Sequence, residues 1–535
     1  MACDPRSHRV RTAIEPATSA GRAVDRFLGT VAVVIVAPSI YSLRVADSDL
    51  WGHLGYGRWF DQYGIGGDDP FSYATAGRTW YCHEYLSQII LWRTYARFGP
   101  PGLIALKCVL AASAIFLVYR SLRLSTDDSR IWAPILMLSA CLLRGYLFFR
   151  PQLFTYLFFA AFVLVLLRHL LQQGSPLWIL PPSLALWANL HGGFVAGIAI
   201  LGVALCLAGL RGVSERWHLA GSWRETWELG CVLVLCMVAS LLNPLGWRIW
   251  SLLWIELGNT YNHRFIAEWQ TARLFPPNWN GGLLLSLLVL VGLATRGAQL
   301  RGTRPGRLPP WIWMVSILPL AAMAIRSHRH APLFVLWTAP ILALLTAAAA
   351  PTSGRRGSVL LLAVTFVIVL ATALPVAATM LNPLPKIRRV LHGRGAEPAG
   401  AASFLRANAF AGRIYNPLWW GSYLTWELYP RILVSCDGRN DTIYPVERIG
   451  ENLFFYGTRD ADLEAPLRDS ADFLIAPAHS LVASRMLDDP RWAIVYEDSE
   501  SSLFVRNDGA HRDLLDLARQ GRLRPAVQPL DDSFE

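Results

Sequence analysis

"ADSDLWGHLGYGRWF", residues 46–60, begins where the first apolar run of the chain, 27–45, ends. Two aspartates, Asp47 and Asp49, therefore lie at the edge of a predicted membrane-spanning helix, and His53 follows one turn after the second of them. If the stretch is helical, Asp49 and His53 share one face at positions i and i+4. What these side chains can do depends on the side of the membrane that they face.

The composition around this stretch is that of a polytopic membrane protein. Of 535 residues, 53% are hydrophobic and 16% are charged, and the mean hydropathy is +0.34. A soluble domain could not solvate so much apolar surface. The formal net charge of +11 comes almost wholly from arginines in short clusters between apolar runs, which favours anchoring to anionic lipid head groups over binding to nucleic acid.

Apolar runs of roughly the ~20 residues that a helix needs to cross a bilayer recur along the chain and predict about eleven spans. The first run has no small-residue cleavage site after it and is expected to be retained. The runs are 27–45, 101–120, 131–148, 152–170, 177–190, 192–210, 227–243, 281–296, 311–325, 331–349 and 357–380.

The arginines orient these spans. If segment 1–26 is cytoplasmic, the arginine clusters of alternate loops all fall on the cytoplasmic side, as the positive-inside rule requires. These clusters are Arg120 with Arg123, Arg168, Arg211 with Arg216, Arg296 with Arg301, Arg304 and Arg307, and Arg355 with Arg356. The loop 46–100 and the tail from about 385 are then predicted to lie outside, in the periplasm or its equivalent.

Four arginines at the outer ends of spans depart from that rule. Arg144 and Arg150 flank "GYLFF", and Arg326 and Arg329 lie in "IRSHRH" together with His328. One interpretation is that they reach to lipid head groups. The other is a site for a lipid-linked phosphate or pyrophosphate, because guanidinium groups pair bidentately with phosphate oxygens.

The remainder of the predicted outer loop is rich in polar groups. "WYCHEYL" carries His83 and Glu84, and "GGDDPFSY" carries Asp68 and Asp69. Carboxylates beside a span can act in catalysis or merely cap the next helix. The Gly-Gly-Asp-Asp-Pro setting favours a turn for the aspartate pair, whereas His53 and His83 are either substrate-binding or interfacial packing residues.

A second outer motif is "WANLHGG", residues 187–193, between the fifth and sixth predicted spans. Asn189 and His191 are candidates to line a substrate cavity, and the paired glycines permit a close turn. A polar turn that satisfies its own backbone is the alternative.

The tail has a different pattern, with strand-length apolar runs separated by helix-like stretches, which predicts a small α/β domain. Asp437, Arg439 and Asp441 follow one of these runs and indicate either a ligand site at the carboxyl end of a strand or a salt-bridged turn. Cys82 and Cys436 lie outside the predicted spans and could pair, although no disulfide framework is expected. The strand-length runs are 413–416, 431–438, 472–477, 492–498 and 502–506.

The motifs "DPFSY", "GRTWYCHEYL", "RPQLFTYLF", "LWANLHGGF" and "RHAPLF", taken in order over residues 27–380, resemble bacterial membrane proteins of the GT-C glycosyltransferase class. Relatives in that class include protein O-mannosyltransferases, aminoarabinose transferases and the catalytic subunit of oligosaccharyltransferase. The resemblance implies polyprenyl-phosphate or diphosphate sugar donors used on the outer face, and an essential acid at Asp47 or Asp49. The frequent second acidic pair has only His83 and Glu84 as its counterpart here.

The expected protein is therefore mainly α: a multi-pass, GT-C-like inner-membrane protein with a small external α/β domain. Its predicted parts are a cytoplasmic segment 1–26, a transmembrane domain 27–384 that includes the outer loop 46–100, and an external domain 385–535. Its expected partners are a polyprenyl-linked sugar donor and a glycan, lipid or protein acceptor.

The chemistry expected of such a transferase assigns roles to the candidate residues. Asp47, Asp49 and Glu84 are the catalytic candidates, and these three carboxylates would be the ligands if a divalent cation such as Mg²⁺ or Mn²⁺ is used. The substrate-binding candidates are His53, His83, Arg144, Arg150, Asn189, His191, Arg326, His328 and Arg329.

Two other classes of function stay open. A non-catalytic scaffold for envelope assembly would tolerate loss of the loop carboxylates. A lipid or solute transporter would place ionisable residues near the middle of several spans, whereas the notable charges here gather at the outer ends.

Overall fold

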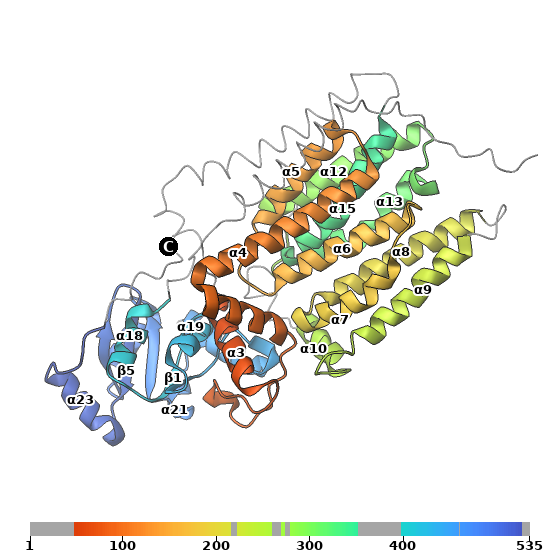
Figure 1. The fold of residues 1–535 in the computed structure, drawn as a ribbon. Helices are drawn as coiled ribbons and strands as arrows, with labels where there is room; N and C mark the ends of the chain where they lie inside the picture. The colour runs from red at the N-terminus through yellow and green to blue at the C-terminus, as the bar shows by residue number, and fades with distance from the viewer. Residues whose placement is uncertain are drawn as a thin grey trace, which may run out of the picture.

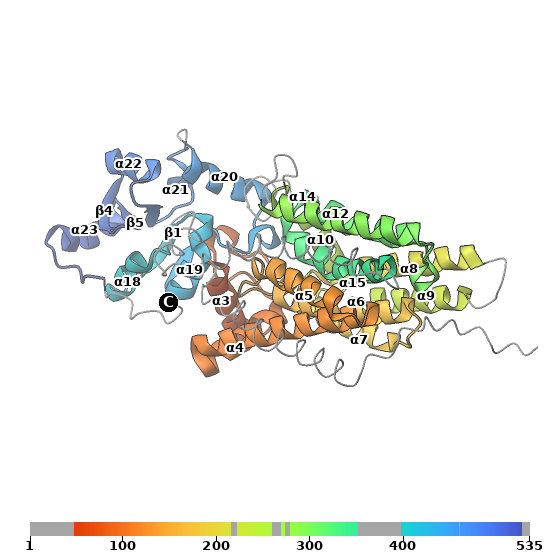
Figure 2. The same cartoon turned by 90° about the horizontal axis from the view of Figure 1, so that it is seen from above.

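The computed structural model describes residues 48–215, 222–258, 269–272, 279–350, 397–458 and 461–526. Within them, a bundle of long helices occupies residues 85–350, and a small sheet flanked by helices occupies residues 397–526. Figures 1 and 2 show the sheet and its helices at one end of the bundle, next to helix α3 (Ser48–Tyr63).

All nine predicted apolar runs that lie in the described residues fall on helices, and the other two, 27–45 and 357–380, lie outside those residues. Within the described part of the chain, four segments are long and apolar enough to cross a membrane: Tyr85–Ser125, Gln152–Leu170, Phe194–Arg211 and His328–Ala349. The count of about eleven spans stays a prediction. The bundle helices are α4 (Tyr85–Ser125), α5 (Ser129–Arg144), α6 (Gln152–Leu170), α7 (Leu180–Leu190), α8 (Phe194–Glu215), α9 (Ser222–Ala239), α10 (Arg248–Gly258), α12 (Trp279–Leu300), α13 (Pro310–Ser316), α14 (Leu318–Arg326) and α15 (Ala331–Ala349).

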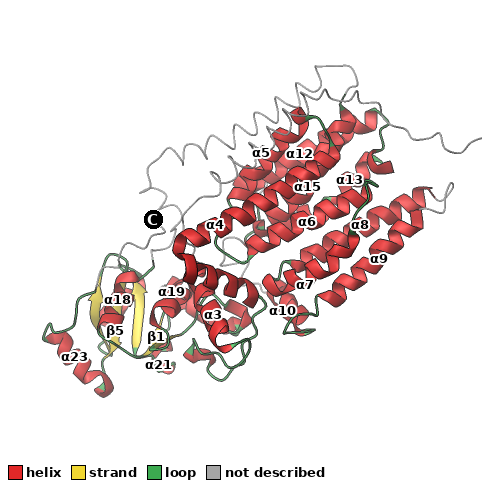
Figure 3. Ribbon diagram, in the orientation of Figure 1, coloured by secondary structure: helices red, strands yellow, loops and turns green. Residues whose placement is uncertain are grey.

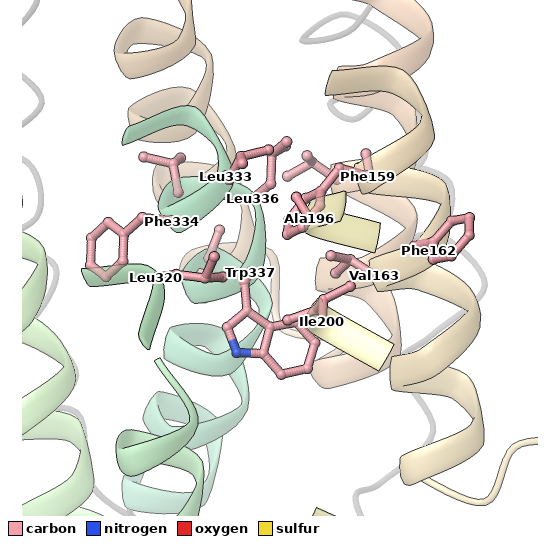
Figure 4. Close-up of a cluster of buried hydrophobic side chains, with 14 of the residues drawn as sticks. Phe159, Phe162, Val163, Ala196, Ile200, Leu320, Leu333, Phe334, Leu336 and Trp337 are labelled. Carbon is pink, nitrogen blue, oxygen red and sulfur yellow. The ribbon is translucent and has the colours of Figure 1, made fainter. Parts of the chain in front are cut away.

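Helix α15 forms the centre of the bundle. It is apolar around its circumference and packs against α4, α5, α6, α12 and α14, which is the pattern of a helix buried on all sides. Figure 4 shows Leu336 and Trp337 of this helix facing Phe159 of α6 and Ile200 of α8. The indole N–H of Trp337 donates to Ser316 Oγ at 3.3 Å, so the large ring is buried without an unpaired donor.

Much of the predicted outer loop 46–100 is helical. Helix α3 occupies its beginning, and the first part of α4 occupies its end. Gly99 interrupts α4 with φ 62° and ψ −161°, a backbone conformation that glycine adopts at no steric cost, and two prolines follow it. The kink therefore separates an outer helical segment from the part of α4 that is predicted to cross the membrane.

The five strand-length runs of the tail coincide with five strands in the order β2-β1-β3-β5-β4. Figure 3 shows their sheet in yellow beside helix α18. Strands β2, β1 and β3 are parallel, and β5 pairs antiparallel with both β3 and β4. The strands are β1 (Gly412–Tyr415), β2 (Ile432–Val434), β3 (Phe473–Pro477), β4 (Trp492–Glu497) and β5 (Ser501–Arg506). The helices are α18 (Ala399–Ala407), α19 (Leu418–Leu428), α20 (Val446–Gly457), α21 (Ala465–Arg468), α22 (Leu481–Asp488) and α23 (Arg512–Arg519).

The outer loop and this C-terminal unit, residues 397–526, share buried apolar cores. Leu50 and Leu54 of α3 pack in one cluster with Trp420 and Leu424 of α19. At the sheet, Ser72 forms a parallel bridge with Val434 of β2, whose N–H donates to the Phe71 carbonyl at 3.2 Å. The loop between the first two predicted spans is therefore packed into the C-terminal unit. The division at residue 385 stays a prediction.

Cys82 and Cys436 do not pair with each other. Cys82 and Cys436 are both buried free thiols. The considered Cys82–Cys436 disulfide is therefore wrong.

Candidate active site

Asp49 lies in the first turn of α3, where the positive end of the helix dipole favours a carboxylate. Its Oδ2 pairs with Arg150 Nη2 at 3.0 Å, and its side chain is 36% exposed. Arg150 stands in the bend between α5 and α6, at one end of the bundle. The structure thus brings together two residues that the sequence separates by a hundred positions, and it presents an accessible carboxylate held by a cation.

The C-terminal unit forms one wall beside this carboxylate. A Cβ atom added at Gly438 would lie 3.1 Å from Asp49 Oδ1 and 2.7 Å from Ser422 Oγ. The N–H of Gly438 donates to Ser422 Oγ at 3.2 Å, which fixes the two segments against each other. No sequence pattern near Asp49 indicates this contact, because its partners lie more than 370 residues further along the chain.

Glu84 forms a second group with two histidines. Its Oε1 lies 3.6 Å from His83 Nε2 and 3.3 Å from His191 Nε2. Burial alone would raise the pKa of Glu84, but the neighbouring imidazoles of His83, His191 and His53 outweigh it and hold that pKa well below its ordinary value. Glu84 is therefore ionised at neutral pH.

His191 is held in one tautomer by its neighbours. Its Nδ1 accepts the N–H of Gly193 at 2.8 Å and contacts Thr155 Oγ1 at 2.8 Å, while that oxygen accepts the indole N–H of Trp187 at 2.9 Å. Since Nδ1 acts as an acceptor, the ring proton lies on Nε2 and points toward Glu84. Burial lowers the pKa of His191 to about 3, against the attraction of Glu84, so the imidazole is neutral.

Helix α3 connects the two groups. It is helical over Ser48–Tyr63, so the predicted i, i+4 relation of Asp49 and His53 is confirmed. Gln88 Nε2 lies 3.2 Å from His53 Nδ1, and Gln88 is one turn beyond Glu84 in α4. Asp49 with Arg150 and Glu84 with its histidines are therefore neighbouring parts of one polar region.

Arg329 belongs to the same region. It lies in the turn after α14, and its positive charge acts on His191 and lowers the pKa of that imidazole further. Its guanidinium lies 4.9 Å from the ring centroid of Trp269. The Arg326 side chain is exposed, whereas the Arg326 carbonyl and the His328 N–H are bonded to Thr271 and Gln270, so this turn is fastened to residues 269–272.

Asn189 has a contact pattern of a different kind. Its amide accepts the Tyr85 hydroxyl at 2.7 Å and donates to the carbonyls of Ala185 and Leu242, both at 2.7 Å. These bonds fasten α7 to α4 and to the segment after α9, so the predicted substrate-binding role of Asn189 draws no support from its contacts. Arg144 ends α5.

Lys107 is a buried cation that the sequence interpretation did not select. It lies in α4 with its Nζ 4.5 Å from the ring centroid of Phe149, and it is within electrostatic range of Arg144. Phe149 precedes Arg150 directly. The sequence does contain a feature that could have identified Lys107 as a candidate: it is one of two lysines in the chain, and it interrupts an apolar run.

Metal ligation receives no support from the described side chains. No group of three or more His, Cys, Asp and Glu residues among them is arranged to hold a metal ion. Asp49 and Glu84 have different immediate partners, and Asp47, the third predicted ligand, lies outside the described residues. A divalent cation stays a prediction.

No protein-family model and no curated protein matches the sequence. The fold is similar to that of the GT-C membrane glycosyltransferases, as the resemblance predicted. Arabinofuranosyltransferase AftD from Mycobacteria aligns over 91% of this chain with a TM-score of 0.53 and 15% identity. ArnT from Cupriavidus metallidurans, in a structure bound to undecaprenyl phosphate, aligns over 91% of this chain and 98% of its own, with a TM-score of 0.47 and 14% identity. The chain covers 42% of AftD, less than half of that protein.

Proposed function

We propose that this chain is a membrane glycosyltransferase that moves a sugar from a polyprenyl-phosphate or diphosphate donor to an acceptor on the outer face of the membrane. The observation that carries the proposal is the accessible Asp49 carboxylate, held by Arg150 at 3.0 Å within a GT-C fold. A carboxylate of this kind is suited to accept a proton from a hydroxyl group in a polar region at one end of the bundle.

Asp49 is the proposed general base. The acceptor oxygen attacks the anomeric carbon of the donor sugar, the bond from that carbon to the phosphate oxygen breaks, and its electron pair leaves with the phosphate. The acceptor proton passes to Asp49. Asp47 remains the alternative base from the sequence interpretation, and it lies outside the described residues.

The departing phosphate requires positive charge. Arg150, Arg144 and Lys107 are the proposed phosphate-binding group near Asp49, and Arg329 is the cation beside the Glu84 group. Cations fixed before the reaction stabilise the charge that develops on the leaving oxygen.

Glu84, His83 and His191 are proposed to bind sugar or acceptor hydroxyl groups. The ionised Glu84 carboxylate, oriented by the Nε2 proton of the neutral His191 imidazole, offers acceptor oxygens to such hydroxyl groups. The His53 imidazole, bonded to Gln88, extends this polar surface toward Asp49.

The test is transfer of labelled sugar from a panel of short-chain polyprenyl-phosphate and diphosphate donors by the purified chain in lipid nanodiscs. We expect Asp49→Asn to lose about 10²–10⁴-fold in rate, since a positioned base contributes that much. Asp61→Asn is the matched control. Asp61 lies on the same helix but away from this site, and its carboxylate pairs with Arg93 at a distance of 2.7 Å.

Equal activity of wild type, Asp49→Asn and Asp61→Asn would refute the assignment of Asp49 as the base. Repeating the assay with Mg²⁺, Mn²⁺ or a chelator tests the predicted cation, because a metal-dependent transferase loses its activity on chelation and regains it when the ion is restored.

A further inference from the structure

The turn Asp437–Gly438–Arg439 brings the C-terminal unit against Asp49. It follows β2 directly, at the carboxyl ends of the three parallel strands, the edge where α/β sheets commonly carry ligands. Gly438 stands so close to Asp49 Oδ1 and Ser422 Oγ that an added Cβ would lie 3.1 and 2.7 Å from these two atoms. The sheet therefore presents its ligand-binding edge to the proposed base.

Arg439 fixes this turn by a fully buried network. Its Nε and Nη2 donate to Asp437 at 2.9 Å, and its Nη1 and Nη2 donate to Asp69 of the outer loop at 2.5 and 3.0 Å. The side chain is 2% exposed, and both carboxylates are fully buried. The salt-bridged turn considered for Asp437 and Arg439 is confirmed, and the Asp441 side chain lies outside the described ones.

Aromatic rings enclose the same guanidinium. Its central carbon lies 4.7 Å from the ring centroid of Trp80 and 5.7 Å or less from those of three further rings. A planar cation that pairs with two carboxylates and contacts ring faces has one favourable position. The backbone of Gly438, one residue away, is held with it. The other rings are those of Tyr56, Phe71 and Tyr444.

We propose that the C-terminal unit completes the active site: Gly438, which has no Cβ, lets the turn approach Asp49 closely enough to keep its carboxylate in place for the acceptor hydroxyl, and Arg439 is the positioning residue that holds Gly438 there. This inference rests on the proposed function of Asp49. Gly438 does not have a positive φ, so alanine at this position changes the space beside Asp49 and leaves the backbone conformation unstrained.

The first arm of the test measures transfer by Gly438→Ala. The added methyl group must displace Ser422 Oγ and crowd Asp49 Oδ1. We expect kcat to fall about tenfold or more, since a small misplacement at the reacting atoms is costly, while the KM for the donor stays unchanged. Gly457→Ala is the control, because no atom lies within 4 Å of its added Cβ and Gly457 also lies in the C-terminal unit.

The second arm does not depend on activity. A cysteine is introduced by Asp49→Cys, alone and combined with Gly438→Ala or Gly457→Ala, and its labelling by a water-soluble maleimide is measured. The labelling of the corresponding proteins without Asp49→Cys is subtracted, because the native cysteines also react. We expect Gly438→Ala to slow the labelling at position 49 severalfold and Gly457→Ala to leave it unchanged. If the wild type transfers no sugar, that result counts against the proposed function, and the labelling experiment alone then tests the inference about Gly438.

Equal labelling of the two combined variants would overturn the inference. So would an unchanged kcat of Gly438→Ala in an enzyme that Asp49→Asn inactivates.

Discussion

His191 shows how local contacts set the chemistry of a residue. Two donors reach its Nδ1, the backbone N–H of Gly193 and the hydroxyl of Thr155, so the ring cannot take a second proton there without losing both bonds. Burial acts in the same direction, and the imidazole stays neutral far below its ordinary pKa. The sequence indicates a histidine beside two glycines and cannot indicate this state, because Thr155 comes from a different helix.

The lowered pKa of His191 predicts an acid-sensitive stability. Below pH 6.5 the unfolded chain protonates this histidine, whereas the folded chain does not until about pH 3, so stability falls as the pH falls through this range. We expect His191→Asn to weaken the dependence of unfolding on pH between 6.5 and 4.5 by up to roughly 1 kcal/mol per pH unit. The measurement is the apparent Tm by tryptophan fluorescence in detergent.

His479→Asn is the control for this pH series, since His479 is an exposed histidine. A pH dependence of His191→Asn equal to that of the wild type would contradict the neutral state of His191.

Arg329 and Arg326 were equivalent in the sequence and are not equivalent in the structure. Arg329 acts electrostatically on His191, whereas the Arg326 side chain is exposed. We expect Arg329→Ala to weaken donor binding by about 1.5–3 kcal/mol, or roughly 10- to 150-fold, and Arg326→Ala to weaken it less. Arg329→Lys should recover part of the loss, because it keeps the charge without the planar fork. Titration of a short-chain polyprenyl-phosphate sugar into each variant measures this, and equal affinities would return both arginines to a head-group role.

At the scale of elements, helix α3 and the buried Arg439 join the outer loop to the C-terminal unit. Period and length of the apolar runs predicted the helices and the five strands, since those features depend on neighbours in sequence. They could not predict that Asp69 and Arg439, 370 positions apart, form one ion pair. A turn-forming Asp-Asp-Pro and a charged turn each look self-sufficient in the sequence, and only the packing of the outer loop on the sheet joins them.

The buried ion pair predicts a large effect of a conservative substitution. Arg439→Lys retains one charge but has three donors at one point in place of the planar fork of five, so it leaves buried carboxylate oxygens of Asp69 and Asp437 unpaired. We expect a loss on the order of 2–3 kcal/mol of stability. Arg431→Lys is the control, because Arg431 is exposed in the same unit and should change stability by less than about 0.5 kcal/mol. Similar apparent Tm values for the two variants would contradict the role of Arg439.

For the whole molecule, composition and the order of motifs were sufficient for the membrane class and the GT-C fold, because a bilayer restricts spanning segments to few architectures. The candidate site was only partly predictable. Asp49 and Glu84 were selected, but Lys107, Gln88 and Gly438 complete their surroundings from helices and turns that no local pattern connects.

The shared cores place a constraint on topology. Residues 48–84 and 397–526 pack together, so they must lie on the same side of the membrane. With the predicted cytoplasmic N-terminus, we expect alkaline phosphatase fused after residue 535 to be active and a fusion after residue 216, on the predicted cytoplasmic side, to be inactive. The reverse pattern would contradict the predicted orientation and the outer location of Asp49.

The parallel bridge between Ser72 and Val434 has a consequence for biosynthesis. Strand β2 is an edge strand, and an uncovered edge recruits strands from other chains. The segment around Ser72 that covers this edge is made more than 360 residues before β2. Until β2 has been synthesised, the aromatic side chains of the loop and Asp69 therefore lack their partners. A part of the chain that is made late therefore completes a part that is made early. Chains truncated before residue 440 are expected to be targets for chaperones and proteases of the envelope.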